Sequence, residues 1–600
     1  MNYVAPIKDM QFVLNELAGL KQIQTLPGCE EATDETVAAV LEENARFMGE
    51  VVAPLNRTGD VEPAKWDNGR VITTPGFKQA FDAFVQAGWQ GVQHPGEFGG
   101  QGLPKVVAAP CMEMLQSANL SFALCPLLTD GAIEALLTAG SDEQKSTYIH
   151  RLIDGSWTGT MNLTESQAGS DLAQVRTRAV PQGDGTYRLF GQKIFITFGE
   201  HDLAENIVHL VLARTPDAPE GVKGISLFIV PKFLFDAEGK LGKRNDVYCA
   251  SIEHKLGINA SPTCVLLFGD EKGEVGPGAI GQLIGQENRG LEYMFIMMNA
   301  ARFQVGMQGI AVCERAYQQA VWYAKDRVQS RAVEGSPGPV PIIRHPDVRR
   351  MLMFMRANTE AARAVAYVAA GHNDLAHHHP DADARAAAKA AYDYLVPIVK
   401  GWSTEMSIDV TSTGVQVHGG MGFVEETGAA QYYRDARILT IYEGTTAIQA
   451  NDLIGRKTSR DGGATARRFA EQMRATAKEL DVAGGDCAPI AGRLRAAVDA
   501  YVEVIDFVVR EFKGGDVRAV YAGSVPYLKL AGIVHGGWQM ARAALASSRR
   551  LADGEDPDFH RAKIGTARFF ADHMLVMAAA LAAAATEGSA GTLALTEEQF

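Results

Sequence analysis

The chain has 600 residues, of which 46% are hydrophobic and 21% are charged. Such a chain can bury a large core, which excludes disorder along its whole length. The 57 basic and 71 acidic residues leave a net charge of −14, whereas proteins whose main partner is nucleic acid are more often basic.

The pattern of apolar residues predicts helices in the first quarter of the chain. From residue 36 to residue 157, apolar residues recur every three or four positions, as in Thr36–Pro54, and a Gly-rich loop at 95–102 interrupts them. We interpret 36–157 as an N-terminal helical domain. Residues 1–35 precede it as a leader whose apolar positions suit one helix: Phe12, Val13, Leu17 and Leu20.

The pattern changes between residues 158 and 280. Short segments rich in β-branched and aromatic residues alternate here with glycine and aspartate, as in Gly183-Asp184-Gly185. We therefore expect an antiparallel β-domain. Four of these segments predict strands: Tyr187–Phe190, Lys193–Thr197, Ile207–Ala213 and Ile225–Pro231.

Long helical segments return at 281–460, where the loop Arg331–Pro341 is the main interruption. An Ala-rich block at 461–600 follows and has the helical period as well. The expected fold is mainly α with a central β-domain. Its order is helical domain, antiparallel β-domain, helical bundle and C-terminal helical extension.

Neither the N-terminus nor the cysteines suggest a secreted or membrane protein. The N-terminus lacks a basic region followed by an apolar run, and the longest apolar run, Met574–Ala585, is too short to span a bilayer. The seven cysteines form no CxxC pair and are odd in number, which argues against a disulfide framework or a zinc ribbon. We expect a cytoplasmic protein without stable membrane insertion and without a metal site.

Three segments contain candidate chemistry. Residues 163–171, LTESQAGSD, offer hydroxyl and backbone N–H donors to a phosphate or a flavin edge, although an ordinary polar turn explains them equally well. Residues 416–423, QVHGGMGF, allow close backbone approach to a ligand, and the absence of Lys-Ser or Lys-Thr excludes a P-loop. Within 434–449, Glu443 lies between an apolar stretch and a Gly-Thr-Thr turn. Loss of solvation there would raise its pKa and make it a base, whereas an exposed Glu at a helix start is the alternative.

In this order and at these separations, the three segments resemble the signatures of the acyl-CoA dehydrogenase family. LTESQAGSD is similar to its first signature, QVHGGMGFVEETGAAQYYRDARI to its second, and IYEGTTAIQ to its catalytic loop. The resemblance covers about residues 36–460 and matches the family's order of α-domain, β-domain and α-domain. The leader and the C-terminal block resemble the large bacterial branch that includes 3-methylmercaptopropionyl-CoA dehydrogenases.

The resemblance implies an FAD-dependent α,β-dehydrogenation of an acyl-CoA thioester to the trans-2-enoyl-CoA, as in fatty acid β-oxidation. By its match to the family's YEG pattern, Glu443 is the base that removes the α-proton while the β-hydrogen leaves as hydride to the flavin. The backbone N–H of Glu443 and a ribityl hydroxyl of FAD then polarise the thioester carbonyl. Members with the base on the long helix carry it at the position of Ala301, which cannot act as a base.

The resemblance also implies ligand contacts. Many members have Trp where this chain has Phe195, so ring stacking is kept and an indole hydrogen bond is lost. Acyl-CoA contacts are implied at Ser170, Asn299, Arg302 and Gly444, with a helix-surface ion pair as the alternative for Arg302. FAD contacts are implied at Leu163, Thr164, Ser170, Phe195, Thr197, Arg327, Gln416, Gly419, Gly420 and Thr445. Of these, Arg327 and the 416–420 loop are expected to reach the FAD of a partner subunit.

The family implies electron transfer to an electron-transfer flavoprotein, and the C-terminal extension suggests a homodimer where shorter members form tetramers. Because shorter members pair their dimers through C-terminal helices, we expect the extension to cover that face.

An acyl-CoA oxidase, a DNA-binding flavoprotein and a membrane-associated long-chain enzyme are the alternatives. The DNA-binding alternative is disfavoured, because residues 461–600 hold 16 basic and 18 acidic residues. The expected substrate is 3-methylthiopropanoyl-CoA or a short- or medium-chain acyl-CoA.

Overall fold

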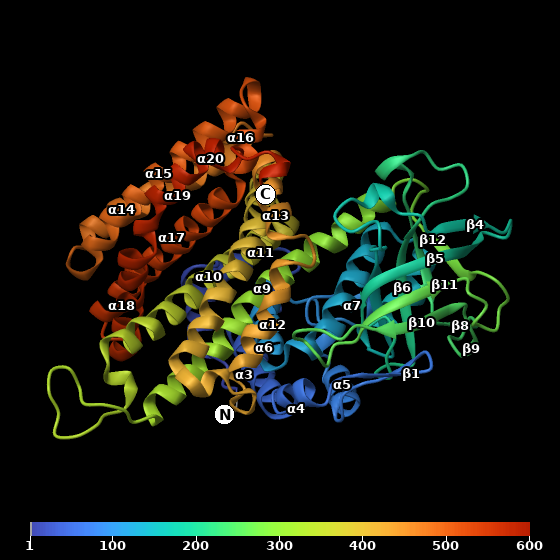
Figure 1. The fold of residues 1–600 in the computed structure, drawn as a ribbon, viewed down its shortest axis with the longest axis horizontal. Helices are drawn as coiled ribbons and strands as arrows, with labels where there is room; N and C mark the ends of the chain where they lie inside the picture. Colours follow the sequence, from blue (N-terminus) through green and yellow to red (C-terminus); the bar gives the residue numbers. More distant parts are fainter. Residues whose placement is uncertain (1–2) are drawn as a thin grey trace.

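The computed structural model describes residues 3–600, so the first two residues of the expected leader lie outside the described residues. Figure 1 shows a β-domain at one end of the molecule, a central bundle of long helices, and a C-terminal helical block at the other end. The expected order of helices, strands and helices is confirmed, including the helical extension.

Local capping residues define the starts of the N-terminal helices. Thr33 accepts a hydrogen bond from the N–H of Thr36 at the start of α3, and Ser141 forms a reciprocal capping box with Gln144 at the start of α8. The helices are α1 (Ile7–Glu16), α2 (Leu20–Ile23), α3 (Asp34–Phe47), α4 (Leu55–Val61), α5 (Phe77–Gln86), α6 (Lys105–Ala118), α7 (Leu120–Ala139) and α8 (Asp142–Ile153). The π-helical turn η1 (Met48–Val52) follows α3, and a hairpin of β1 (Lys65–Asp67) and β2 (Arg70–Ile72) follows α4.

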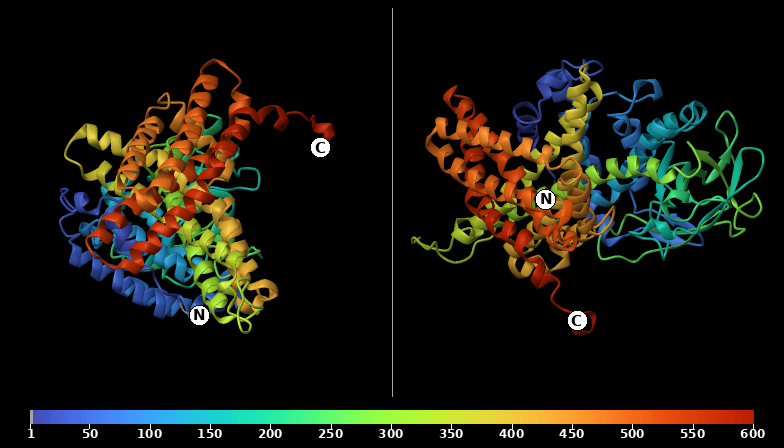
Figure 2. Two further views of the ribbon diagram at one scale, coloured as in Figure 1. Left: turned by 90° about the vertical axis from the view of Figure 1, so that its left-hand side faces the viewer. Right: turned by 90° about the horizontal axis from the view of Figure 1, so that it is seen from above.

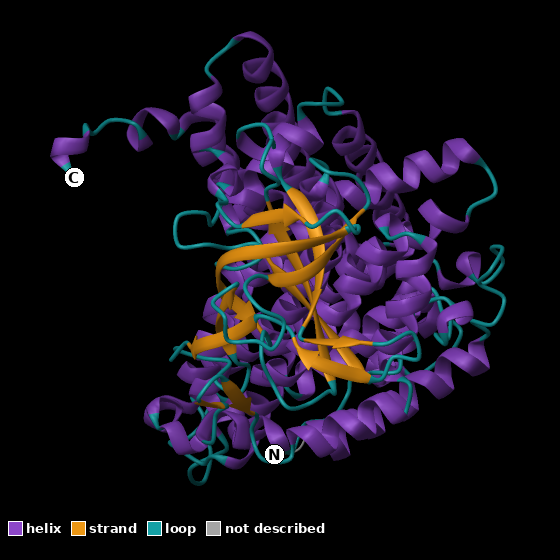
Figure 3. Ribbon diagram, turned by 90° about the vertical axis from the view of Figure 1, so that its right-hand side faces the viewer, coloured by secondary structure: helices purple, strands orange, loops and turns teal. Residues whose placement is uncertain are grey.

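The main strands gather in one curved sheet (Figure 3) with the order β10-β11-β5-β12-β7-β6-β3 and with β4 beside β5. Two predicted strands are halves of the single strand β5. The sheet is antiparallel as expected except at one edge, where β3 and β6 pair in parallel. The chain between them, which contains β4 and β5, lets β6 re-enter the sheet in the direction of β3. The strands are β3 (Trp157–Asn162), β4 (Arg178–Pro181), β5 (Thr186–Thr197), β6 (Asn206–Ala213), β7 (Ser226–Pro231), β8 (Phe233–Phe235), β9 (Leu241–Arg244), β10 (Val247–Ile252), β11 (Thr263–Phe268) and β12 (Ala279–Ile284).

Three long helices form the central bundle, and the expected loop at 331–341 joins the first two. Gly309 permits close packing of the first helix on the third, because a Cβ there would lie 2.6 Å from the carbonyl oxygen of Ser403. The bundle contains α9 (Gly290–Asp326), α10 (Pro346–His378), α11 (Ala382–His418), α12 (Ala429–Ala436), η9 (Arg437–Thr440), α13 (Thr446–Asp452) and η10 (Leu453–Thr458).

The C-terminal extension folds back on this bundle. Its helix α17 packs against α10, α11 and α13, and Gly532 allows the close approach, because a Cβ there would lie 2.1 Å from Cγ of Trp402. Beyond the last helix the C-terminus projects from the body of the molecule (Figure 2). The extension contains α14 (Ala464–Ala483), α15 (Ala488–Gly514), α16 (Val517–Ala522), α17 (Ser524–Ala552), α18 (Pro557–His573), α19 (Ala578–Glu587) and α20 (Ser589–Thr592).

A buried ion network joins the leader, the bundle and the extension. Arg363 of α10 pairs with Asp9 of α1 at 2.7 Å and with Glu113 of α6 at 2.5 Å. Lys563 of α18 pairs with the same Asp9 and, at 2.6 Å, with Glu360 of α10. Since breaking a buried pair leaves an uncompensated charge, the network holds the leader and the extension against the bundle.

Two helical stretches are long and apolar enough to cross a membrane. The stretch Leu120–Ala139 is 83% buried inside the protein, and the stretch Pro557–Glu587, which includes the Ala-rich run of the extension, is 39% buried. Length and composition alone do not distinguish a membrane span from a core helix of a soluble protein.

Candidate active site

A cavity of about 1200 Å³ lies between the β-domain, α9 and the segment that carries Glu443. Two residues of the C-terminal extension, Phe512 and Tyr521, also line it. Segments that are far apart in the sequence thus meet around one space. The structure brings together nine of the residues predicted from the sequence along its wall: Leu163, Thr164, Ser170, Phe195, Thr197, Arg302, Glu443, Gly444 and Thr445.

Glu443 lies in the loop between η9 and α13, half-buried in the cavity wall. Its φ is +54°, a conformation that is rare for a non-glycine residue and that clusters at functional sites. Thr445 then caps α13 by accepting a hydrogen bond from the N–H of Ile448 at 3.4 Å. Burial raises the pKa of the Glu443 carboxyl to about 7, against the opposing effect of the cations Arg302 and Lys400. A carboxylate with such a pKa can accept a proton near neutral pH.

Lys400 of α11 holds both ends of the Glu443 loop. Its buried ammonium donates hydrogen bonds to the carbonyl of Leu439 at 2.9 Å and to that of Gly444 at 2.7 Å. Burial lowers the pKa of Lys400 to about 7, while the nearby Glu443 carboxylate favours its charged form. Lys400 was not predicted from the sequence, although a single lysine within the apolar run Leu395–Trp402 indicates a buried charge that needs partners.

Two residues of α9 complete this side of the cavity. Gln308 accepts a hydrogen bond from the hydroxyl of Tyr442, which precedes Glu443. The guanidinium of Arg302 lines the cavity and lies 3.6 Å from the Asp452 carboxylate. Arg302 therefore has an ion-pair partner, but it is buried in the cavity wall and does not lie on a helix surface, so the alternative of a helix-surface ion pair is wrong.

The segment 163–171 is held against strand β5. Glu165 accepts a hydrogen bond from the buried Lys193 ammonium at 2.8 Å, and the N–H of Ile194 donates to the carbonyl of Thr164 at 2.9 Å. Although burial acts to raise it, the Lys193 cation lowers the pKa of Glu165 to about 2, so the pair stays ionised. The polar turn at 163–171 is thus a fixed part of the cavity wall.

Phe195 presents a flat apolar face at this wall. The residue has a φ of +59° and keeps 59% of its surface exposed, which is unusual for a large apolar side chain. The hydroxyls of Thr164 and Thr197 line the same cavity. An aromatic face next to hydroxyl groups fits a flavin, whose ring system is apolar on its faces and polar at its edges.

The remaining five predicted residues do not line the cavity. Asn299 lies on the exposed side of α9. The other four are exposed where the ends of α9 and α11 lie side by side, as the contact between the rings of Tyr323 and His418 shows, with centroids 4.4 Å apart. These four residues are Arg327, Gln416, Gly419 and Gly420.

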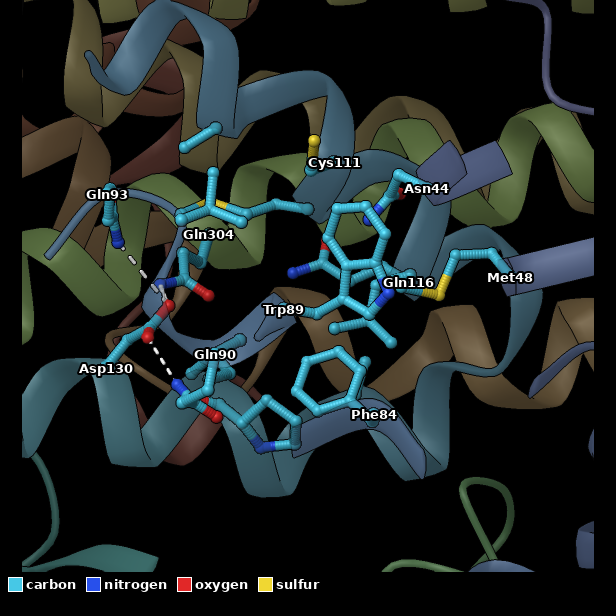
Figure 4. A pocket seen from close by; sticks show the side chains of 17 residues that line it. Asn44, Met48, Phe84, Trp89, Gln90, Gln93, Cys111, Gln116, Asp130 and Gln304 are labelled. Atoms are coloured by element: carbon cyan, nitrogen blue, oxygen red, sulfur yellow. Dashed lines mark hydrogen bonds between the residues drawn. The ribbon is translucent and has the colours of Figure 1, made fainter. Parts of the chain in front are cut away.

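A second cavity, of about 40 Å³, lies between α6, α7 and α9 (Figure 4). Asp130 accepts hydrogen bonds there from Gln90 at 2.5 Å and Gln93 at 3.5 Å, and its carboxylate lies 2.8 Å from Nε2 of His94. The space suffices for one or two water molecules and is too small for a substrate. We regard it as part of the packing of the N-terminal domain.

Four family models match successive parts of the chain. They describe an acyl-CoA dehydrogenase N-terminal domain over 34–156, a middle domain over 160–270, a C-terminal domain over 288–457, and an acetyl-CoA dehydrogenase C-terminal-like region over 469–596. Among curated proteins, 3-methylmercaptopropionyl-CoA dehydrogenase of Ruegeria pomeroyi is 56% identical over 577 residues, which cover 96% of each chain.

Solved structures share the fold as well. An acyl-CoA dehydrogenase complexed with FAD from Bacillus anthracis is similar with a TM-score of 0.73 and 22% identity, over 98% of this chain and 93% of that chain. The electron transferring flavoprotein of Acidaminococcus fermentans is similar with a TM-score of 0.57 and 26% identity, over 70% of this chain and 97% of that chain.

Proposed function

Because this chain belongs to the acyl-CoA dehydrogenase family, we propose that it oxidises a short acyl-CoA thioester with Glu443 as the base, as a homodimer that reduces an electron-transfer flavoprotein. Dehydrogenation of acyl-CoA and the use of FAD follow from the family itself. The acyl chain length, the roles of single residues and the partners are our proposals.

In the proposed reaction, the Glu443 carboxylate takes the α-proton of the thioester. This C–H group is a weak acid, so the charge that develops on the carbonyl oxygen requires a preorganised donor, and the chain supplies the N–H of Glu443. Lys400 and Gln308 keep the loop in place while the proton moves. Thr164, Phe195 and Thr197 would hold FAD, which would supply the hydride acceptor for the β-hydrogen.

The packing of α7 on α9 is the feature from which we infer the acyl chain length. None of its lining residues comes from α7, although this helix packs against α9. Met297 of α9 fills the space between the two helices, because a Cβ at Gly131 would lie 2.9 Å from its Cγ. A long acyl tail that extended from the cavity towards α7 would have to displace Met297. A short chain, including the 3-methylthiopropanoyl group suggested by the Ruegeria relative, requires no such displacement.

The exposed residues expected to bind FAD support the homodimer. Arg327 and Gln416 lie outside the cavity of their own chain, and the same two segments of the chain carry the large exposed apolar side chains Trp322 (52% exposed) and Phe423 (88% exposed). Exposed apolar side chains of this size are typical of subunit interfaces. A second copy packed here would bring these polar groups to its partner's cofactor.

The acceptor and the compartment follow from the family and the composition. The similarity to an electron transferring flavoprotein structure supports an acceptor of that kind. All seven cysteines are buried and free, which supports a reducing compartment such as the cytoplasm. The near-neutral extension does not support DNA binding.

The test is anaerobic mixing of the holoenzyme with acyl-CoA thioesters from C3 to C16 and with 3-methylthiopropanoyl-CoA. We expect the fastest flavin bleaching with the short and thioether substrates. Glu443→Gln should keep FAD and bind substrate but lose nearly all bleaching, whereas the exposed Glu426→Gln should behave as wild type. In air, an electron-transfer flavoprotein should be reduced with little oxygen consumption. Bleaching of Glu443→Gln at the wild-type rate would show that another residue is the base.

A further inference from the structure

Two aromatic residues of the C-terminal extension are part of the wall of the Glu443 cavity. Phe512 lies in the last turn of α15 and Tyr521 in α16, and their rings pack edge to face with centroids 6.0 Å apart. Tyr521 keeps 39% of its surface exposed. The extension therefore contributes to the substrate cavity in addition to covering the bundle.

The helical segment after Glu443 leaves room for this aromatic pair. A Cβ at Gly455 of η10 would lie 3.3 Å from the Tyr521 hydroxyl and 3.8 Å from Cζ of Phe512. The absence of a side chain at Gly455 thus lets both rings lie against the backbone of η10.

Positive charge lies next to the pair. Arg456 follows Gly455, its side chain is 61% exposed, and its guanidinium lies 5.6 Å from the centre of the Phe295 ring. Arg456 and Arg302 share a single acidic partner, Asp452, at 3.7 Å and 3.6 Å. Because Arg302 also faces Glu443, the exposed Arg456 guanidinium is the group that an anionic ligand can use.

The distance from Glu443 identifies which part of a substrate reaches this end. Between Thr446 and Gly455 the helical segment rises about 14 Å, at about 1.5 Å per residue. A thioester whose carbonyl lies at Glu443 can extend the far portion of its CoA along this segment to Gly455. That portion is a nucleotide with an adenine ring and phosphates. Adenine stacks on aromatic side chains, and phosphates pair with guanidinium groups.

On the basis of the proposed function, we propose that Phe512, Tyr521 and Arg456 form a subsite for the nucleotide end of the acyl-CoA substrate. The C-terminal extension thus takes part directly in substrate binding. It acts on the affinity for CoA thioesters and leaves the proton transfer at Glu443 unchanged, because the two ends of the cavity are separate.

The test compares two thioesters with the same acyl group, one of CoA and one of pantetheine, which lacks the nucleotide. Tyr521→Ala and Phe512→Ala holoenzymes should each raise KM for the acyl-CoA about tenfold, within the range for one stacked base, with kcat and FAD content unchanged. KM for the acyl-pantetheine should equal that of wild type. Val517→Ala, an exposed position on the same short helix that does not line the cavity, is the matched control and should change neither KM.

An unchanged KM for acyl-CoA in both variants would overturn the inference, and so would an equal rise of KM for both thioesters. If the alanine variants fail to fold, the exposed Arg456→Gln variant still tests the subsite. Calorimetry should show that this variant binds 3′-phosphoadenosine 5′-diphosphate more weakly than wild type does. Equal binding of this nucleotide to wild type and Arg456→Gln would also contradict the subsite. Inactivity of the wild type towards every acyl-CoA would instead contradict the proposed function. The calorimetry needs no turnover, so it tests the subsite even in that case.

Discussion

At the scale of single residues, the pKa of Glu443 sets the pH range of the proposed reaction. Its pKa is raised to about 7 and only the deprotonated form is a base, so kcat/KM should rise with pH, about tenfold between pH 6 and pH 8. Lys400→Met removes a cation that lowers this pKa, so the acid limb should move to higher pH. Lys400→Arg keeps the charge and serves as the control. An acid limb at the same pH in Lys400→Met would show that the ammonium does not act on Glu443.

Met297 is the second residue whose substitution has a defined outcome. Met297→Ala should open the space beside Gly131, and kcat/KM for an octanoyl-CoA should rise about tenfold relative to that for a C4 substrate. Gly131→Ala narrows the same space and should have the opposite effect. The removal of buried methylenes costs about 2–5 kcal/mol of unfolding free energy, so a thermal melt should accompany the kinetics. An unchanged chain-length profile in Met297→Ala would exclude Met297 as the limit.

At the scale of elements, the adjacent ends of α9 and α11 form the surface on which the homodimer proposal depends. Arg327→Ala and Gln416→Ala should each weaken FAD retention, because both residues would act on the cofactor of the partner subunit. The ratio of flavin to protein after gel filtration, measured together with solution mass, is the readout. Lys325→Ala, an exposed cation half a turn away, is the control. A fully flavinated monomer in solution would contradict the proposal.

At the scale of the whole molecule, the packed extension predicts the assembly. The apolar side of α15 is buried as expected, with Leu494, Val498, Ile505 and Val508 inside and Val502 half-buried. If the extension occupies the face through which shorter family members pair their dimers, light scattering should give twice the mass of the chain. Deletion of 461–600 should expose the apolar surface around Trp402 and cause aggregation or tetramer formation. A stable tetramer of the full-length protein would be incompatible with this arrangement.

The sequence by itself determined the order of helices, strands and helices, the family, and a base candidate that the structure places in a cavity. These features depend on local periodicity and on contiguous motifs such as IYEGTTAIQ, which are properties of neighbouring residues. Nine of the fourteen predicted site residues line that cavity for the same reason, since they belong to such motifs.

Only the tertiary structure decided the contacts between distant segments. Lys400 bonds to a carbonyl 44 residues away, β3 pairs in parallel with β6, and Tyr521 lies beside the segment of Glu443. No local pattern encodes these contacts, because each depends on where the chain returns after a long excursion and on which buried polar groups need partners there. For that reason the sequence identified the extension as helical, and the fold revealed that two of its aromatic residues line the Glu443 cavity.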